Sequence, residues 1–327
     1  VTRFYDFEVN PKIEDAQRGV KLARDAGIEV IIAVGGGSVI DMAKLIKALY
    51  SQPSLSHELA KGVIAVSDPN IPLIVAPTTA GSGSEATHFA VVYIGLDKYS
   101  LASPLLLPEI VILDGKLIVT GTPYQKACNG LDAMAQAIES AWAVGSTEES
   151  RALSFEALAL CVKYLKSVTG ETHNSEAIQG MIKAANLAGQ AINISKTTAA
   201  HAWSYGITSS YSVPHGHAVW LTLPAIFQIH AQATDENVSD PRGLMHLKNV
   251  MDTLKKILSI SPDDQIEKKM REYLLNINIS ADLSIIGATT TKKRLLLSNM
   301  ANMQRMENNP VRLENTDISK IFSLSTF

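Results

Sequence analysis

The sequence predicts two domains of different class, an α/β domain followed by an all-α domain. In the first part of the chain, short β-branched runs alternate with glycine turns and helical patterns. From Pro123 onward, apolar residues recur at three- and four-residue spacing, which is the period of amphipathic helices. The length of 327 residues allows about two domains. We place the boundary near Thr120–Pro123, so that the predicted domains are 1–119 and 120–327.

Strands alternate with helices in the predicted first domain. Asn10 and Pro11 look like a cap and a first-turn proline, and they predict a helix that runs through Ala26. Another helix is expected after the turn Gly35–Ser38. The strands are predicted at Glu29–Val34, Ile71–Ala76, Phe89–Ile94 and Ile110–Leu113. The first of these is rich in β-branched residues, which is typical of a buried parallel strand.

The second domain consists of predicted helices only. They are expected at Ala127–Ala143, Ser150–Ser167, Glu176–Ile194, Ala218–Ala231 and Leu244–Leu258. The two cysteines of the chain, Cys128 and Cys161, both lie inside these apolar patterns. We therefore expect reduced core thiols rather than a disulfide, as in a reducing compartment.

The composition excludes several classes of partner. A net charge of -3 and a pI near 6.3 argue against a clustered basic face for nucleic acid or an anionic membrane surface. No apolar run reaches the ~20 residues that a membrane-spanning helix needs. The first residues, Val1 to Phe4, have neither the apolar core nor the cleavage site of a signal peptide. The expected location is the cytoplasm.

Two glycine-rich segments follow predicted strands and suggest a cofactor site. Gly35–Ser38 comes between a strand and a helix, where glycines let the backbone approach a diphosphate at the helix N-terminus. Thr78–Ser84 follows the next strand and is rich in small hydroxylated residues and glycine. Two such loops at neighbouring strand ends favour dinucleotide binding. Each could also be no more than a tight turn.

Three or four side chains of the helical part could hold a divalent metal. Asp132 and Gln136 lie four residues apart, on one face of a predicted helix. His201 and His215 follow later in the chain. One carboxylate and two imidazoles suit zinc or ferrous iron. Spacing alone leaves a structural role open, because an aspartate can favour a helix start and a histidine can lie in a core.

Several short motifs occur in a fixed order along the chain. They are Gly-Gly-Gly-Ser-x-x-Asp-x-Ala-Lys at 35–44, Pro-Thr-Thr-Ala-Gly-Ser-Gly-Ser-Glu at 77–85, Gly-x-Asp-Ala at 130–133, His201, Pro-His-Gly at 214–216 and Arg305-Met306-x-Asn308-Asn309-Pro310. In this order the chain resembles the iron-containing, or group III, alcohol dehydrogenases over nearly its whole length. The resemblance implies a dehydroquinate-synthase-like fold, with a Rossmann-like cofactor domain, a helical metal domain and the active site between them. It also suggests a homodimer.

The resemblance assigns roles to individual residues. It implies that Asp132, His201 and His215 bind the metal and take part in catalysis. It implies that NAD(H) or NADP(H) is bound by residues of the two loops, the helix that follows and a lysine. These are Gly35, Gly36, Gly37, Ser38, Asp41, Thr78, Thr79, Ser82 and Lys98.

The chain departs from the family pattern at two positions of the helical part. The family's usual histidine four residues after the aspartate is Gln136, and another common histidine is Tyr205. Glutamine is a poor ligand beside imidazole. Related glycerol dehydrogenases manage with one aspartate, two histidines and water, so zinc becomes as credible as iron. Gln136 stays a candidate fourth ligand, and Tyr205 a candidate for the proton relay.

A third departure concerns the start of the sequence. Family members carry about one more βαβ unit ahead of this point. That unit contains the acidic residue that selects NAD over NADP. We expect the sequence to be a fragment or to lack that unit, and the choice between NAD and NADP stays open.

The segment before His201 indicates an anionic substrate. Lys196, Thr197 and Thr198 place a cation and two hydroxyls ahead of a candidate metal ligand, which suits a phosphonate. This segment resembles that of the phosphonoacetaldehyde reductases, which form 2-hydroxyethylphosphonate. A solvated surface role for Lys196 is the alternative. Other open hypotheses are a dehydrogenase of an uncharged alcohol or diol, a dehydroquinate-synthase-like lyase, and a nucleotide-binding protein without catalytic metal.

Overall fold

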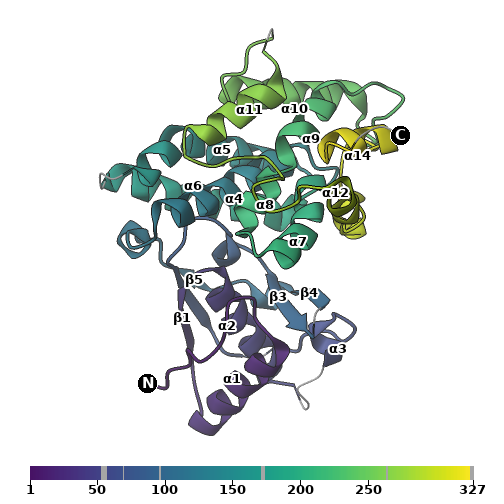
Figure 1. Cartoon of the computed structure of the whole chain (residues 1–327). Helices are drawn as coiled ribbons and strands as arrows, with labels where there is room; N and C mark the ends of the chain where they lie inside the picture. The colour runs from purple at the N-terminus through teal and green to yellow at the C-terminus, as the bar shows by residue number, and fades with distance from the viewer. Residues whose placement is uncertain (53–56, 69, 96, 171–173, 263, 325–327) are drawn as a thin grey trace.

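The strands lie in the first part of the chain and the helices dominate the second. The computed structural model describes residues 1–52, 57–68, 70–95, 97–170, 174–262 and 264–324. A parallel sheet has the strand order β1-β2-β5, and a separate antiparallel hairpin is formed by β3 and β4 (Figure 1). The strands are β1 (Ile31–Gly35), β2 (Leu73–Pro77), β3 (Phe89–Ile94), β4 (Asp97–Ala102) and β5 (Ile110–Val111).

The helices of the first part flank these strands. They are α1 (Ile13–Ala26), α2 (Gly37–Tyr50) and α3 (His57–Ala60), with short 3-10 turns at Ser84–Ala86, Pro104–Leu106 and Gly115–Ile118. α1 begins two residues later than Pro11, the first-turn proline of the predicted helix. The carbonyl of Pro11 accepts a hydrogen bond from the Tyr93 N–H (2.8 Å), so this segment is extended along β3 before the helix starts.

The second part is a helical bundle around α4, α5 and α6 (Figure 1). Its helices are α4 (Pro123–Trp142), α5 (Glu148–Thr169), α6 (Ser175–Ser195), α7 (Ala199–Tyr211), α8 (His215–Trp220), α9 (Leu223–Ala231), α10 (Gly243–Ile257), α11 (Ile266–Leu275), α12 (Thr291–Ser298), α13 (Met303–Met306) and α14 (Asn315–Ile321). Cys128 and Cys161 are buried, free thiols, as predicted. The domain boundary at residue 119 stays our proposal.

The helix predicted at Ala218–Ala231 is two helices. α8 ends at Trp220, and α9 begins at Leu223 with Pro224 in its first turn. Proline has no N–H to donate to the preceding turn, and its ring clashes with that turn, so one continuous helix cannot form here.

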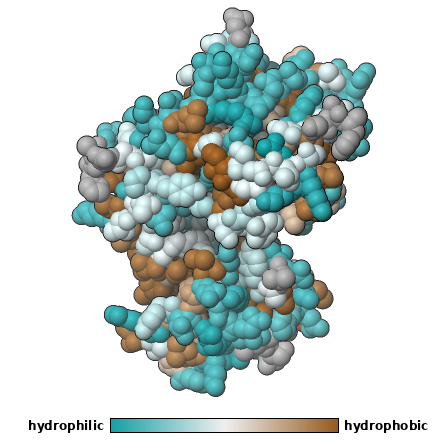
Figure 2. Space-filling view, viewed as in Figure 1, coloured by the Kyte–Doolittle hydropathy of each residue, from teal (hydrophilic) through white to brown (hydrophobic). Residues whose placement is uncertain are grey.

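The parallel sheet is covered on one face only within the described residues. Along β1, Ala33 is buried, whereas Ile32 and Val34 are 63% and 57% exposed. Ile110 of β5 is also exposed, and Figure 2 shows apolar surface over this side of the sheet. The prediction of a buried strand was therefore wrong for one face, because α2 packs on the other. The helices within the described ranges include none with the length and apolarity to cross a bilayer.

Candidate active site

The turn after β1 and the loop after β2 lie against each other. β1 ends at Gly35 and α2 begins at Gly37, with Gly36 as its N-cap. A Cβ atom on Gly36 would lie 3.2 Å from the Thr79 side chain, and one on Gly37 would lie 2.7 Å from Ser82 Oγ. Glycine is needed where the two loops touch, and no side chain caps the α2 N-terminus. The first N–H groups of α2 can therefore receive a phosphate.

The other predicted cofactor residues of these loops lie at the same edge. Gly35 pairs with Pro77 in the parallel register, and the Thr78 N–H donates to the Gly35 carbonyl (2.9 Å). Ser38 Oγ accepts a hydrogen bond from the Asn10 N–H (3.2 Å). The structure thus brings both loops together, and their contact with the cofactor stays a prediction.

A buried lysine holds the second loop in place. Lys44 Nζ donates to the carbonyls of Ser84 (2.6 Å), Thr87 (2.6 Å) and Phe89 (2.8 Å). Burial lowers the pKa of Lys44 to about 8, against the attraction of nearby carboxylates. Asp41, a predicted cofactor residue, accepts a hydrogen bond from Ser84 Oγ (2.5 Å) and so helps to hold the end of the same loop.

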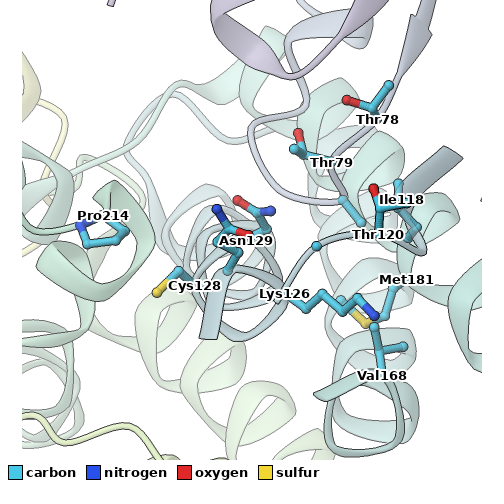
Figure 3. Close-up of a pocket in the computed structure, with 13 residues that line it drawn as sticks. Thr78, Thr79, Ile118, Thr120, Lys126, Cys128, Asn129, Val168, Met181 and Pro214 are labelled. Atoms are coloured by element: carbon cyan, nitrogen blue, oxygen red, sulfur yellow. The ribbon is translucent and has the colours of Figure 1, made fainter. Parts of the chain in front are cut away.

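The second loop also joins the two parts of the molecule. Gly83 has a φ of 63°, and a Cβ atom there would lie 2.5 Å from Gly189 Cα on α6, so only glycine allows this approach. Beside the loop is a cavity of about 270 Å³. Figure 3 shows Thr78 and Thr79 on one side of it and α4 on the other. The α4 side chains that line it are Gln125, Lys126, Cys128 and Asn129.

Asp132, His201 and His215 converge next to this cavity, one turn beyond Cys128. They come from α4, α7 and the start of α8, and one ligand atom of each lies within 4.8 Å of the others. Asp132 Oδ1 lies 3.5 Å from His201 Nε2 and 3.9 Å from His215 Nε2. The His215 side chain is 33% exposed, whereas those of the other two are under 10% exposed. The group therefore opens to solvent on the side of His215.

The chemistry of this group fits a divalent cation. Asp132 Oδ1 and His201 Nε2 are buried and have no hydrogen-bond partner among the described residues. A second carboxylate, Glu139, lies against His201 Nδ1. Two carboxylates beside one buried imidazole leave excess negative charge, which is unfavourable in a protein interior unless a cation balances it.

The pKa values of the two imidazoles are shifted in opposite directions. Burial opposes the protonation of His201, but the carboxylates of Glu139 and Asp132 raise its pKa to about 10. Burial lowers the pKa of His215 to about 3, and only Asp132 opposes this shift. His215 is therefore neutral at pH 7 and has a lone pair to offer to a metal. The two histidines lower the pKa of Asp132, in spite of its burial.

Gln136 lies between the group and the second loop. Its Nε2 donates to the Ser82 carbonyl (3.1 Å), and its Oε1 is buried without a partner among the described residues. An amide oxygen is a weak ligand for a first-row metal. Gln136 as a metal ligand stays a prediction.

Tyr205, Lys98 and Arg305 surround the open side of the group. The Tyr205 ring stacks on His215 with ring centroids 5.7 Å apart. Lys98 Nζ lies 3.6 Å from the centroid of the Tyr205 ring. Arg305 is hydrogen-bonded to Tyr205, and together with Lys98 it lowers the pKa of Tyr205 in spite of burial. Lys98 thus lies beside the candidate metal ligands, and its contact with the cofactor stays a prediction.

The predicted substrate segment is mostly buried. Thr197 is 4% exposed and Thr198 is fully buried, whereas Lys196 is exposed at the end of α6. The Thr198 hydroxyl donates to Glu139 Oε1 (2.8 Å) and accepts from Trp142 Nε1 (2.9 Å). Only Lys196 of the three is free to reach a solvent-borne anion. Their role in substrate binding stays a prediction.

The sequence interpretation missed two side chains of the site, Glu139 and Arg305. Glu139 follows Asp132 by seven residues, which is two helical turns, so the periodicity of α4 could have placed both on one face. Arg305 begins the last of the ordered motifs, but the motif alone assigns it no role, because the position of the short helix α13 beside α7 depends on the tertiary fold.

A glycine turn at a helix N-terminus, a hydroxyl-rich loop and a group of metal-binding residues meet between a sheet and a helical bundle. This arrangement defines a metal-dependent, nicotinamide-linked dehydrogenase. The family model "Iron-containing alcohol dehydrogenase" matches residues 1–115, and the model "Fe-containing alcohol dehydrogenase family, C-terminal" matches residues 126–326. The chain belongs to the iron-containing alcohol dehydrogenase family.

Individual relatives agree with this assignment. The chain is 30% identical to the probable alcohol dehydrogenase EutG of Escherichia coli, over 86% of this chain and 68% of that protein. It is 28% identical to the phosphonoacetaldehyde reductase of Streptomyces viridochromogenes, over 90% of this chain and 75% of that protein. The predicted class of enzyme, an NAD(P)-dependent alcohol dehydrogenase, is confirmed.

A solved structure confirms the dehydroquinate-synthase-like fold. The sulfoacetaldehyde reductase of Bifidobacterium kashiwanohense, in complex with NAD+, is similar with a TM-score of 0.85 and 26% identity. The match covers 99% of this chain and 83% of that one. A nicotinamide dinucleotide and a divalent metal are the cofactors expected for this chain, and this agrees with the family and with the group at Asp132.

Proposed function

We propose that this enzyme reduces phosphonoacetaldehyde to 2-hydroxyethylphosphonate with NADH or NADPH. One observation carries the proposal: two cations, Lys98 and Arg305, lie beside the open side of the metal group. Neither forms an ion pair with a carboxylate in the part of the chain that the structure describes. Two half-buried cations without a counter-ion favour a substrate that brings negative charge.

The reaction consumes one hydride and one proton. Bound nicotinamide supplies the hydride, and a bound divalent metal polarises the carbonyl oxygen as a Lewis acid. Asp132, His201 and His215 would hold that metal, with Gln136 as the candidate fourth ligand. Because His215 faces the opening, a substrate oxygen can approach the group from its side.

The remaining residues bind and orient the reactants. Residues 35–38 and the loop that contains Thr78, Thr79 and Ser82 would receive the dinucleotide. Lys98 and Arg305 would attract the phosphonate, and Tyr205 between them is the candidate donor of the proton that completes the alcohol. Lys196 stays a second candidate for the phosphonate, because it is exposed.

The testing experiment compares aldehydes of similar size and different charge. The full-length protein, reconstituted with Fe2+ or Zn2+, is offered phosphonoacetaldehyde, sulfoacetaldehyde and propionaldehyde with NADH and then NADPH. We expect kcat/KM to be highest for phosphonoacetaldehyde, at least ~10-fold above propionaldehyde. A preference for sulfoacetaldehyde would reject the phosphonate and indicate a sulfonate substrate. Turnover of propionaldehyde alone would reject an anionic substrate and favour an uncharged alcohol or diol.

Two variants test which cation binds the anionic group. Arg305→Gln is expected to lower kcat/KM for phosphonoacetaldehyde ~10- to 100-fold, and to lower that for propionaldehyde by a smaller factor, since Arg305 also hydrogen-bonds the candidate proton donor Tyr205. Arg312→Gln is the matched control, since Arg312 is exposed in the same C-terminal segment. If Lys196→Ala abolishes the preference and Arg305→Gln does not, Lys196 binds the phosphonate instead.

We also propose that the enzyme works in the cytoplasm as a homodimer. The two free cysteines suit a reducing compartment, and the dimer is expected from the family resemblance. Light scattering on the full-length protein tests the dimer, and a monomeric mass at micromolar concentration would reject it.

A further inference from the structure

A buried carboxylate lies directly behind the candidate metal ligands. Glu139 is on α4, two turns after Asp132, and its side chain is fully buried. Carboxylates are almost never fully buried unless they are paired, because removing the charge from water is unfavourable. The contacts of Glu139 therefore indicate what it is for.

All of these contacts lie at the start of α7. Glu139 Oε1 accepts from Thr198 Oγ1 (2.8 Å) and from the Ala200 N–H (2.8 Å). Its Oε2 lies within hydrogen-bonding distance of His201 Nδ1. Thr198 is the N-cap residue of α7, yet its own side chain makes no capping hydrogen bond. The carboxylate of Glu139 thus takes the place of a local cap and receives an otherwise unpaired N–H of the first turn.

The contact with His201 decides which nitrogen faces the metal site. A carboxylate is an acceptor only, so His201 Nδ1 must carry the proton and donate it to Glu139. His201 Nε2 lies on the side of Asp132, 3.5 Å from its Oδ1, and is buried without a hydrogen-bond partner among the described residues. In metal sites, this arrangement of carboxylate, imidazole and metal fixes both the tautomer and the orientation of the ring.

We propose that Glu139 is the positioning residue of the metal site, which sets metal affinity by holding His201 through Nδ1 and by capping α7. Thr198 is part of the same device. Its hydroxyl accepts from Trp142 Nε1 (2.9 Å) and is thereby directed to donate to Glu139. The inference concerns only the metal and does not depend on which aldehyde is reduced.

The variant Glu139→Gln tests the proposal with little change of shape. An amide that turns its NH2 group toward His201 requires an acceptor at Nδ1, so the ring proton moves to Nε2 and blocks the ligand atom. We expect the affinity for Zn2+ to fall ~10- to 100-fold. Competition with a chromophoric zinc chelator measures this on the full-length protein without cofactor or substrate. The visible spectrum of the Co2+ form reports whether the ligand set is altered.

A matched control separates positioning from simple structural support. Asp240 is also a buried carboxylate of the helical part, and its side-chain hydrogen bonds go to Arg242 (2.6 Å) rather than to a candidate metal ligand. Asp240→Asn should lower the unfolding midpoint and leave zinc affinity within ~2-fold. Wild-type zinc affinity and an unchanged Co2+ spectrum in Glu139→Gln would overturn the proposal, whatever its stability.

A second variant covers the case in which Glu139→Gln does not fold. Thr198→Val removes one hydrogen bond to Glu139 and keeps the side-chain shape. The expected loss of zinc affinity is ~3- to 10-fold. An unchanged zinc affinity in folded Thr198→Val would likewise contradict the proposal that Thr198 and Glu139 together position His201.

Discussion

In each part of the molecule a fully buried charged side chain holds a neighbouring segment, Lys44 in the first and Glu139 in the second, and the two charges are opposite. In the α/β part, Lys44 donates to three backbone carbonyls of the segment 84–89. In the helical part, Glu139 accepts hydrogen bonds from three residues at the start of α7, Thr198, Ala200 and His201. A cation matches a loop whose carbonyls converge, and an anion matches a helix N-terminus.

The difference lies in what each charge touches besides the backbone. Lys44 contacts the loop beside the cofactor turn and no candidate metal ligand, so it supports the shape of the loop. Glu139 contacts the imidazole of His201, so it supports the chemistry of the site directly. We therefore expect that a change at the metal group leaves NADH affinity nearly unchanged, and that a change at the loop leaves metal affinity nearly unchanged.

Metal removal is the largest expected effect. Dialysis against a chelator should lower turnover of the preferred aldehyde by ~1000-fold or more, since Lewis-acid stabilisation contributes several kcal/mol. The affinity for NADH, measured by its fluorescence, should change less than ~3-fold, because residues 35–38 and 78–82 lie outside the metal group. Readdition of Fe2+ or Zn2+ should restore turnover. An equal loss of NADH binding would contradict the expected independence of cofactor and metal binding.

Lys44→Met is expected to have the next largest effect. It leaves three backbone carbonyls, two of them buried, without their donor, and we expect the free energy of unfolding to fall by about 3 kcal/mol. Urea titration measures this, and NADH binding should weaken because the loop loses its support. Lys21→Met is the control, since Lys21 is exposed on α1. Weakened zinc binding in Lys44→Met would contradict the same expected independence.

The stability of the wild type should depend on pH through Lys44. Folding lowers the pKa of Lys44 from 10.5 to about 8, so between these values the unfolded chain binds the proton more tightly than the folded one. The free energy of unfolding, relative to Lys44→Met, should therefore rise with pH from about 8 toward 10, by on the order of 2 kcal/mol. Urea titrations of both proteins at several pH values measure the difference. A constant difference would show that the pKa is not lowered.

Trp142→Phe is expected to have the smallest effect. It removes the indole N–H that donates to Thr198 and keeps an aromatic ring against Phe227. We expect the free energy of unfolding to fall by about 1 kcal/mol and zinc affinity to stay within ~3-fold. Chemical denaturation and chelator competition measure the two quantities. A larger loss of zinc affinity than of stability would show that Trp142 acts on the metal site more strongly than we propose.

Much of the fold could be predicted from local patterns. β3 has the predicted bounds, and α5, α6 and α10 match their predicted helices within two residues at each end, because each carries a strong apolar period of its own. α7 was missed even though it carries His201. It is rich in alanine, serine and glycine, and its cap comes from Glu139 on another helix rather than from a neighbouring residue. β4 was missed because its polar residues give no strand signal without β3 beside it.

The sequence by itself determined the order of the motifs, the family and the residue types of the site. Glycine turns, helical periods and the positions of Asp132, His201 and His215 are local features, and the structure brings these three together. Only the tertiary structure decided that Glu139 holds His201, 62 residues away in the chain, and that Lys98 and Arg305 meet at Tyr205. The physical reason is that a buried charge is stable only beside its partners, and those partners come from whichever segments the packed core brings near it.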